Sequence, residues 1–384
     1  MFSLELSGLT PQQFLATYWQ KKPTVIRQGF KDFQDPITAD ELAGLACDET
    51  VESRLVYKKA GEWQAEFGPF ESYEHLGERE WTLVVQAVDH WLPQVAALAE
   101  PFNFIPSWRK DDLMMSFSAP GGGVGPHIDL YDVFIIQGTG KRQWRVGERG
   151  AHSEFAAHEA LLHVEDFEPI IDVVLLPGDI LYIPPGFPHD GKALEAALSY
   201  SVGFRTNSGY ELIEGLADYL GEHCLAKDLM TDAGRLMTLR PGEISAQDYD
   251  LIKQHLLKMI NDDELFSRFT GEFLSQAKHE LDIAPQDDEG YSREEVIGLL
   301  QQGTMLHRLG GLRCLYLASG LSQGRFYIDG DEKQLPSEMK AVIQLLCDHS
   351  SVSAELLLPW IEQEAFLEFL IEQLNAGYWY FDGA

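Results

Sequence analysis

The nine-residue stretch Gly121–Asp129 constrains the fold of this chain more than any other. It holds a run of three glycines, a Gly-Pro pair and then His127, Ile128 and Asp129. The glycines and the proline predict a turn, and the apolar run Val133–Ile136 predicts a strand next to it. Side chains two residues apart point to the same face of a strand. His127 and Asp129 would therefore present an imidazole and a carboxylate at one point.

A third candidate ligand lies 60 residues further along the chain. His189 follows the short apolar strand Ile180–Ile183 and a Pro-Pro-Gly turn. Two histidines and one carboxylate form the facial triad that holds Fe(II) in non-haem oxygenases. A lone His-x-Asp pair or a lone distal histidine is usually structural, and only the combination with turns and strands favours a metal. A phosphate loop is disfavoured because no Gly-Lys-Ser/Thr follows the glycines and the next element is a strand.

Two further predicted strands carry polar side chains on one face. In Leu113–Ser118 the alternation places Ser116 on the same face as its neighbours at 114 and 118, and in Lys141–Val146 it groups Arg142 with Trp144. An inward-facing arginine requires an anion, whereas the alternative is a solvated surface strand. Short strands separated by Gly/Pro turns, which recur up to about residue 205, are typical of a jelly roll.

Beyond residue 205 the apolar period becomes helical. The predicted helices of residues 209–270 carry more apolar surface than they can bury alone, which indicates a dimer interface. The C-terminal part combines helices with a short aromatic strand, Tyr378–Phe381, and so resembles a winged helix. From Glu338 onward it contains eight acidic residues and one basic residue, Lys340, which is the wrong sign for a module that reads DNA.

The net charge of −32 is compatible with two explanations. It can serve solubility alone, or it can attract a basic partner and repel bare nucleic acid. Four scattered cysteines without a Cys-x-x-Cys motif suit a reducing compartment. No stretch approaches the length of a membrane span, and the N-terminus does not resemble a secretory signal. These features predict a cytoplasmic protein without a membrane partner and without direct nucleic-acid binding.

The sequence resembles the bacterial JmjC ribosomal oxygenases, which hydroxylate an arginyl residue of a large-subunit ribosomal protein. The resemblance covers essentially the whole chain and is strongest over about residues 10 to 205. The matching segments are Tyr18–Pro23, Ile105–Arg109, Asp111–Leu113, Gly121–Asp129, Tyr131–Phe134, Trp144–Gly147 and Pro177–His189.

This resemblance implies an α+β protein with three parts: a JmjC double-stranded β-helix of the cupin type (residues 1–208), a helical dimerisation region (209–270) and an acidic winged-helix domain (271–384). It implies Fe(II) bound by the catalytic triad His127, Asp129 and His189. It also implies 2-oxoglutarate as cosubstrate, with Arg142 anchoring the far carboxylate and Ser116 as a cosubstrate or substrate contact. The implied partners are a basic ribosomal protein substrate and a second copy of the chain.

Other functions remain open on the residues alone. A cupin with the same ligands could isomerise a small molecule without oxidation, and an oxygenase could act on a different protein or on tRNA. A binding protein could retain the metal for structure only. Release of succinate coupled to oxygen uptake would separate the oxygenase from the isomerase.

Overall fold

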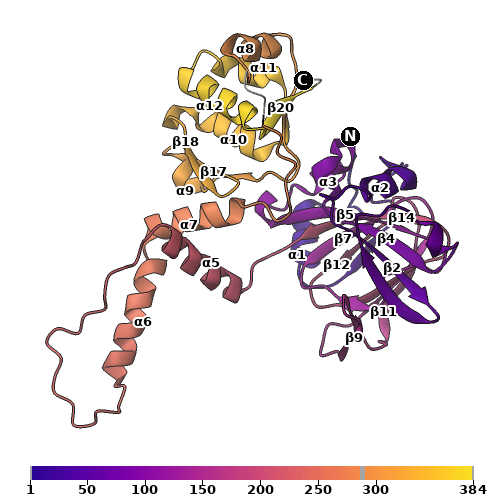
Figure 1. Ribbon diagram of the computed structural model, residues 1–384, viewed down its shortest axis with the longest axis horizontal. Coiled ribbons are helices and arrows are strands. Elements are labelled where there is room, and N and C mark those ends of the chain that lie inside the picture. The colour runs from indigo at the N-terminus through magenta and orange to yellow at the C-terminus, as the bar shows by residue number, and fades with distance from the viewer. Residues whose placement is uncertain (1, 286–289, 383–384) are drawn as a thin grey trace. The chain divides into compact units, whose positions relative to one another are not determined.

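A computed structural model describes residues 2–285 and 290–382 of the 384-residue chain. The chain divides into two compact units. The first comprises Met1–Thr206, Lys278–Asp282 and Leu309–Gly311, and the second comprises Asn207–Ala277, Ile283–Arg308 and Leu312–Ala384. Strands dominate the first unit, drawn in indigo to magenta, and helices dominate the second, drawn in orange to yellow (Figure 1).

Two antiparallel sheets build the first unit. The larger has eight strands in the order β1-β12-β7-β14-β5-β4-β2-β3, and the smaller has four in the order β11-β8-β13-β6. A separate hairpin pairs β9 with β10. The strands are β1 (Thr24–Ile26), β2 (Ser53–Lys59), β3 (Glu62–Phe67), β4 (Trp81–Val85), β5 (Lys110–Ser118), β6 (His127–Ile128), β7 (Asp132–Gln137), β8 (Arg142–Gly147), β9 (Glu154–His158), β10 (Leu161–Val164), β11 (Pro169–Leu175), β12 (Ile180–Ile183), β13 (Pro188–Ala193) and β14 (Ala197–Phe204).

Alternation along the strands gives the large sheet two different faces. On β5, Leu113 and Met115 are fully buried in a core that also includes Phe14 of the N-terminal helix. Burial of each such side chain stabilises the fold by roughly 1.5–3 kcal/mol. Ser116 and Ser118 point to the opposite face, as the sequence predicts. The helical elements of this unit are α1 (Pro11–Thr17), α2 (Ala39–Leu45), η1 (Glu74–Leu76), α3 (Val88–Trp91), α4 (Pro93–Ala96), η2 (Glu100–Phe102) and η3 (Ser107–Arg109).

The second face of the large sheet meets the small sheet. Side chains from β7 and β12 pack there against side chains from β8 in a second apolar cluster that includes Ile135, Leu181 and Trp144. Two antiparallel sheets with side chains interdigitated between them form a jelly roll. The predicted double-stranded β-helix is therefore confirmed. The β9–β10 hairpin is an addition that the sequence did not predict.

The second unit begins with three amphipathic helices, α5 (Gly209–Glu222), α6 (Ala246–Ile260) and α7 (Asp263–Ser275). Ser208 and Ser245 start the first two through capping boxes, in which side chain and backbone satisfy each other's hydrogen bonds. The remaining elements are α8 (Arg293–Gln301), β15 (Leu306–Arg308), β16 (Cys314–Leu315), α9 (Ala318–Leu321), β17 (Arg325–Ile328), β18 (Asp331–Gln334), η4 (Ser337–Met339), α10 (Lys340–Asp348), β19 (Ser351–Val352), α11 (Ala354–Leu357), η5 (Leu358–Trp360), α12 (Glu364–Asn375) and β20 (Trp379–Phe381).

Helices and two small sheets make up the C-terminal part of this unit. The strands pair in the orders β19-β15-β20 and β16-β17-β18. Buried side chains of α10 and α12, such as Ile343 and Leu370, form its core together with Phe381 of the predicted terminal strand. The predicted winged-helix architecture is confirmed. Across residues 2–285 and 290–382, no helix is long and apolar enough to span a membrane.

Candidate functional site

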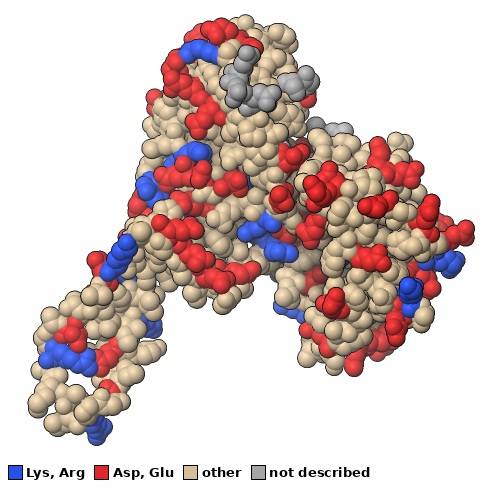
Figure 2. Space-filling view, viewed as in Figure 1, with Lys and Arg blue, Asp and Glu red and all other residues tan. Residues whose placement is uncertain are grey.

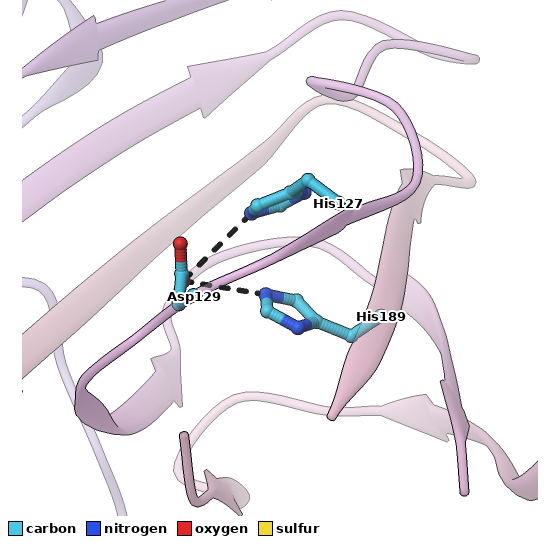
Figure 3. Close-up of side chains that lie close together, drawn as sticks. All are labelled: His127, Asp129 and His189. Carbon is cyan, nitrogen blue, oxygen red and sulfur yellow. Dashed lines mark ion pairs between the residues drawn. The ribbon is translucent and has the colours of Figure 1, made fainter. Parts of the chain in front are cut away.

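The structure brings the three predicted ligands together. His127 lies on β6 and His189 lies opposite it on β13, in register in the small sheet. Asp129 comes directly after β6, and its carbonyl accepts a hydrogen bond of 2.8 Å from the N–H of Gly186. Its Oδ2 atom lies 3.8 Å from Nε2 of His127 and 3.5 Å from Nε2 of His189. Figure 3 shows the three side chains converging, with His189 on one segment and His127 and Asp129 on another.

Backbone carbonyls orient both imidazoles. Nδ1 of His127 donates to the carbonyl of Gly125 at 2.8 Å, and Nδ1 of His189 donates to the carbonyl of Phe187 at 3.0 Å. A carbonyl can only accept, so each Nδ1 carries the proton and each Nε2 presents a lone pair when the ring is neutral. A second hydrogen bond of this kind fixes the ring of most metal-binding histidines.

The electrostatics of the site also suit a cation. Burial and the nearby His189 lower the pKa of His127 to about 4, so its imidazole is neutral at pH 7. Burial opposes ionisation of Asp129, but His127, His189 and the Tyr131 hydroxyl outweigh it and hold its pKa below the ordinary value. Burial lowers the pKa of His189, but its hydrogen bond to Asp129 and the charge of that carboxylate raise it overall. A divalent metal would take the place of the proton on a charged His189, and the same arrangement of side chains would stabilise it.

Arg142, the predicted cosubstrate anchor, is buried on β8 and points between the sheets. Its guanidinium contacts the hydroxyls of Ser116, at 3.4 Å, and Ser118. Its Nε atom is buried without a hydrogen-bond partner. Burial lowers the pKa of Arg142 to about 10, which still leaves it charged at neutral pH. Arg142 also lies over the Trp144 ring, 5.8 Å from its centroid. A buried cation whose hydrogen bonds go to neutral hydroxyls has the properties of an anion-binding group.

Ser118 was not predicted as a site residue, although its position two residues after Ser116 places it on the same strand face. Ser118 also contacts the hydroxyl of Thr82 at 2.8 Å. The second group of potential metal ligands in the described residues, Asp111, Asp112 and His279, was not predicted either. Its carboxylates already serve the fold, because Asp111 pairs with Arg205 at 3.1 Å and Asp112 accepts the backbone N–H of Ala87 at 2.9 Å.

The turn before His127 is braced by the unpredicted hairpin. His163 of β10 donates through Nε2 to the carbonyl of Val124 at 2.8 Å. The next residue, Gly125, adopts a φ of 84°, and a Cβ atom there would lie only 2.3 Å from the His163 ring. The carbonyl of this same glycine orients His127. The position therefore requires glycine for conformation and for space.

We expect Gly125→Ala to lower the free energy of unfolding by about 1–3 kcal/mol, because the left-handed backbone and the contact with His163 both disfavour a side chain. We also expect metal affinity to fall by about 10-fold or more, as when a group that orients a ligand is lost. Thermal denaturation and metal titration measure these effects. Gly150→Ala is the matched control, since a Cβ atom there meets open space. Unchanged stability and metal affinity in Gly125→Ala would contradict this role.

Two regions of the chain match known protein families. Residues 97–212 match the family described as "JmjC domain", and residues 258–380 match "ROXA-like winged helix". The ribosomal protein uL16 3-hydroxylase of Escherichia coli is 48% identical over 370 residues, which cover 96% of this chain and 97% of the relative. A probable ribosomal oxygenase of Haemophilus influenzae is 33% identical and covers 84% of this chain and 82% of its own length.

Solved structures agree with the sequence comparison. The Escherichia coli ribosomal oxygenase YcfD in complex with cobalt and 2-oxoglutarate is 47% identical, with a TM-score of 0.91 and full coverage of both chains. The same protein in complex with cobalt and succinic acid gives a TM-score of 0.90 at 46% identity, again over 100% of each chain. With this similarity extending over both the double-stranded β-helix and the winged helix, the chain belongs to the family of JmjC-domain ribosomal oxygenases.

Proposed function

We propose that this protein is an Fe(II)- and 2-oxoglutarate-dependent oxygenase that hydroxylates an arginyl residue of a large-subunit ribosomal protein. The observation that supports it most is the pairing of a His-Asp-His triad with a buried, anion-free arginine between the same two sheets. The relatives named above act on ribosomal protein uL16 or bind cobalt with 2-oxoglutarate. The uL16 homologue is accordingly the first candidate substrate.

The triad fits Fe(II) because it offers two imidazole nitrogens and one carboxylate oxygen within 4.8 Å of one another. When bound, the metal and 2-oxoglutarate supply the oxidative chemistry, in which the cosubstrate becomes succinate and carbon dioxide while one oxygen atom enters a C–H bond. The side chains of the protein bind and orient the metal and the cosubstrate. His127, Asp129 and His189 hold the metal, and the guanidinium of Arg142 holds a carboxylate of the cosubstrate. The apolar cluster between the sheets excludes water.

Charge favours a basic polypeptide as the substrate. The chain has a net charge of −32, and Figure 2 shows acidic side chains spread over the visible surface. Ribosomal proteins are rich in lysine and arginine, so opposite charge accelerates encounter. The same charge repels the RNA of an assembled subunit. We therefore propose that the substrate is the free ribosomal protein, and that the enzyme acts in the cytoplasm before assembly.

The test compares free ribosomal proteins with assembled large subunits at low and high salt. We expect the free protein to be hydroxylated and the subunit to react slowly. We expect kcat/KM for the free protein to fall as salt rises, because exposed charges are screened beyond about 8 Å at physiological ionic strength. Turnover that is indifferent to salt, or equal for both forms, would contradict the charge argument. Modification of a small molecule without succinate release would contradict the oxygenase itself.

We also propose the three-part division at residues 1–208, 209–270 and 271–384, with the middle part forming a homodimer. Helices α5 and α6 expose large apolar side chains, including Ile213 at 70% and Tyr249 at 63%. Such surface is costly in water, and symmetric pairing is the commonest way to cover it.

We expect light scattering at micromolar concentration to give about twice the chain mass of 43.2 kDa. Ile213→Glu should shift the protein to a monomer, because a charge would be buried in the interface. Leu162→Glu is the control, since it places the same charge at an exposed leucine of β10 in the first unit. A monomeric wild-type protein would refute the dimer.

A further inference from the structure

One arginine of the first unit, on the face of the large sheet that carries Ser116, has no acidic partner among the described residues. Arg54 lies on β2, and its Nε atom is buried without a hydrogen-bond partner. Among residues 2–285 and 290–382, its guanidinium forms no ion pair and no hydrogen bond. Buried guanidinium nitrogens normally have oxygen acceptors, because leaving them without one is costly. Arg54 therefore requires an oxygen acceptor, and no described residue supplies one.

Strand register defines the direction in which Arg54 points. It pairs with Val84 of β4, and Val84 pairs with Ser116 of β5. Residues paired in this way lie on the same face of a sheet. The next residue of β2, Leu55, is fully buried in the core on the opposite face. Arg54 thus shares a face with Ser116, whose hydroxyl contacts Arg142.

The charge of Arg54 reaches the triad. Arg54 lies close enough to His127 for its positive charge to act on that imidazole. A cation at this place disfavours binding of a divalent metal unless an anion lies near both. Asp129 is the one negative charge within the triad, and Asp190 acts on His189 and Arg142. A further anion placed between the triad and Arg54 would remove the conflict and complete the hydrogen bonds of Arg54.

2-Oxoglutarate is a dianion with one carboxylate at each end, and Arg142 and Arg54 are two guanidiniums that form no ion pair with a described residue. The proposed function assigns its remote carboxylate to Arg142. We propose that Arg54 binds the other carboxylate, the one next to the keto group, and is thus a second cosubstrate-binding residue. This inference rests on the proposed function and deepens it. The contact would also neutralise a charge that otherwise repels an arginyl substrate.

Calorimetric titration of the Mn(II)-loaded full-length protein with 2-oxoglutarate tests the proposal without turnover. We expect Arg54→Gln to weaken binding by about 10- to 100-fold, the range for loss of a charge-assisted hydrogen bond. Arg54→Lys should recover part of the affinity, because it keeps the charge but not the planar fork. Lys59→Gln, which removes an exposed charge from the same strand, is the control and should bind normally.

Two keto acids identify the carboxylate involved. 2-Oxopentanoate keeps the carboxylate next to the keto group and lacks the remote one, whereas 4-oxopentanoate keeps only the remote one. Arg54→Gln should lower the affinity for 2-oxopentanoate by the same factor as the affinity for 2-oxoglutarate. Its affinity for 4-oxopentanoate should not change. Arg142→Ala should show the reverse pattern. Near-ultraviolet circular dichroism verifies that each variant is folded. If Arg54→Gln is misfolded, Arg54→Lys is used in its place in the same comparison.

The outcomes separate this inference from the proposed function. If the wild-type protein does not bind 2-oxoglutarate, the proposed function fails and this inference fails with it. If the wild type binds normally and Arg54→Gln binds equally well, only the role of Arg54 is refuted. A variant that keeps its affinity for 2-oxoglutarate but loses affinity for the polypeptide would show that Arg54 contacts the substrate instead.

Discussion

Asp129→Ala is expected to abolish hydroxylation while the protein remains folded. The carboxylate is the single anionic group of the triad, and its Oδ2 atom lies within 4 Å of both imidazoles. Loss of a group that merely orients a ligand costs about 10- to 100-fold, so loss of the ligand itself should lower turnover by more than about 100-fold. Succinate release and metal affinity should fall together.

The fold should tolerate this change. Asp129 contributes electrostatics to the site rather than packing to either apolar core, so we expect the free energy of unfolding of the metal-free protein to change by no more than about 1–2 kcal/mol. Asp129→Asn removes the negative charge but keeps the shape of the side chain, and this variant should also be inactive. Asp166→Ala, which removes an 85% exposed carboxylate from the same unit, is the control. Full activity in Asp129→Ala would remove the triad from the mechanism.

Arg142→Ala is expected to raise the KM for 2-oxoglutarate far more than the KM for the polypeptide. Removing one partner of a buried, hydrogen-bonded charge pair costs on the order of 2–5 kcal/mol, or a factor of roughly 30 to several thousand. The hydroxyls of Ser116 and Ser118 would remain, but neutral donors cannot replace the charge. Steady-state kinetics with each substrate varied separately measures the two constants.

Arg142→Lys is the conservative variant for this experiment. It keeps the positive charge but loses the two-pronged hydrogen bonding, so its KM for 2-oxoglutarate should lie between those of the wild type and Arg142→Ala. Equal increases in both Michaelis constants would argue against an anchoring role. They would point instead to a general disturbance of the space between the sheets.

Local periodicity was enough to predict the central features of the site. The spacing of two residues placed His127 and Asp129 on one side of the chain, and the strand before His189 positioned the third ligand. The same alternation grouped Arg142 with Trp144 but left open whether that face is buried or solvated, and the structure buries both side chains. The strand β6 is shorter than expected, since it ends at Ile128, and the carbonyl of Asp129 accepts a hydrogen bond from Gly186.

Features that depend on the order of strands could not be predicted from local pattern. Arg54 lies in a hairpin whose sequence gives no sign that it adjoins the candidate site. It shares a face with Ser116 because β4 inserts between β2 and β5 and aligns Arg54 with Val84 and Val84 with Ser116. His163 was missed for a related reason, because its short hairpin has a weak polar and apolar alternation and contacts the glycine turn only in the folded chain.

Tandem mass spectrometry of the free uL16 homologue tests the central claim most directly. The protein is incubated with the enzyme, Fe(II), 2-oxoglutarate and isotopically labelled oxygen gas, with Asp129→Ala as the inactive control. Our account predicts one added oxygen atom, derived from the gas and located on an arginyl side chain, with one succinate released per modified chain. An unmodified substrate, oxygen on a different residue type, or equal modification by Asp129→Ala would contradict it.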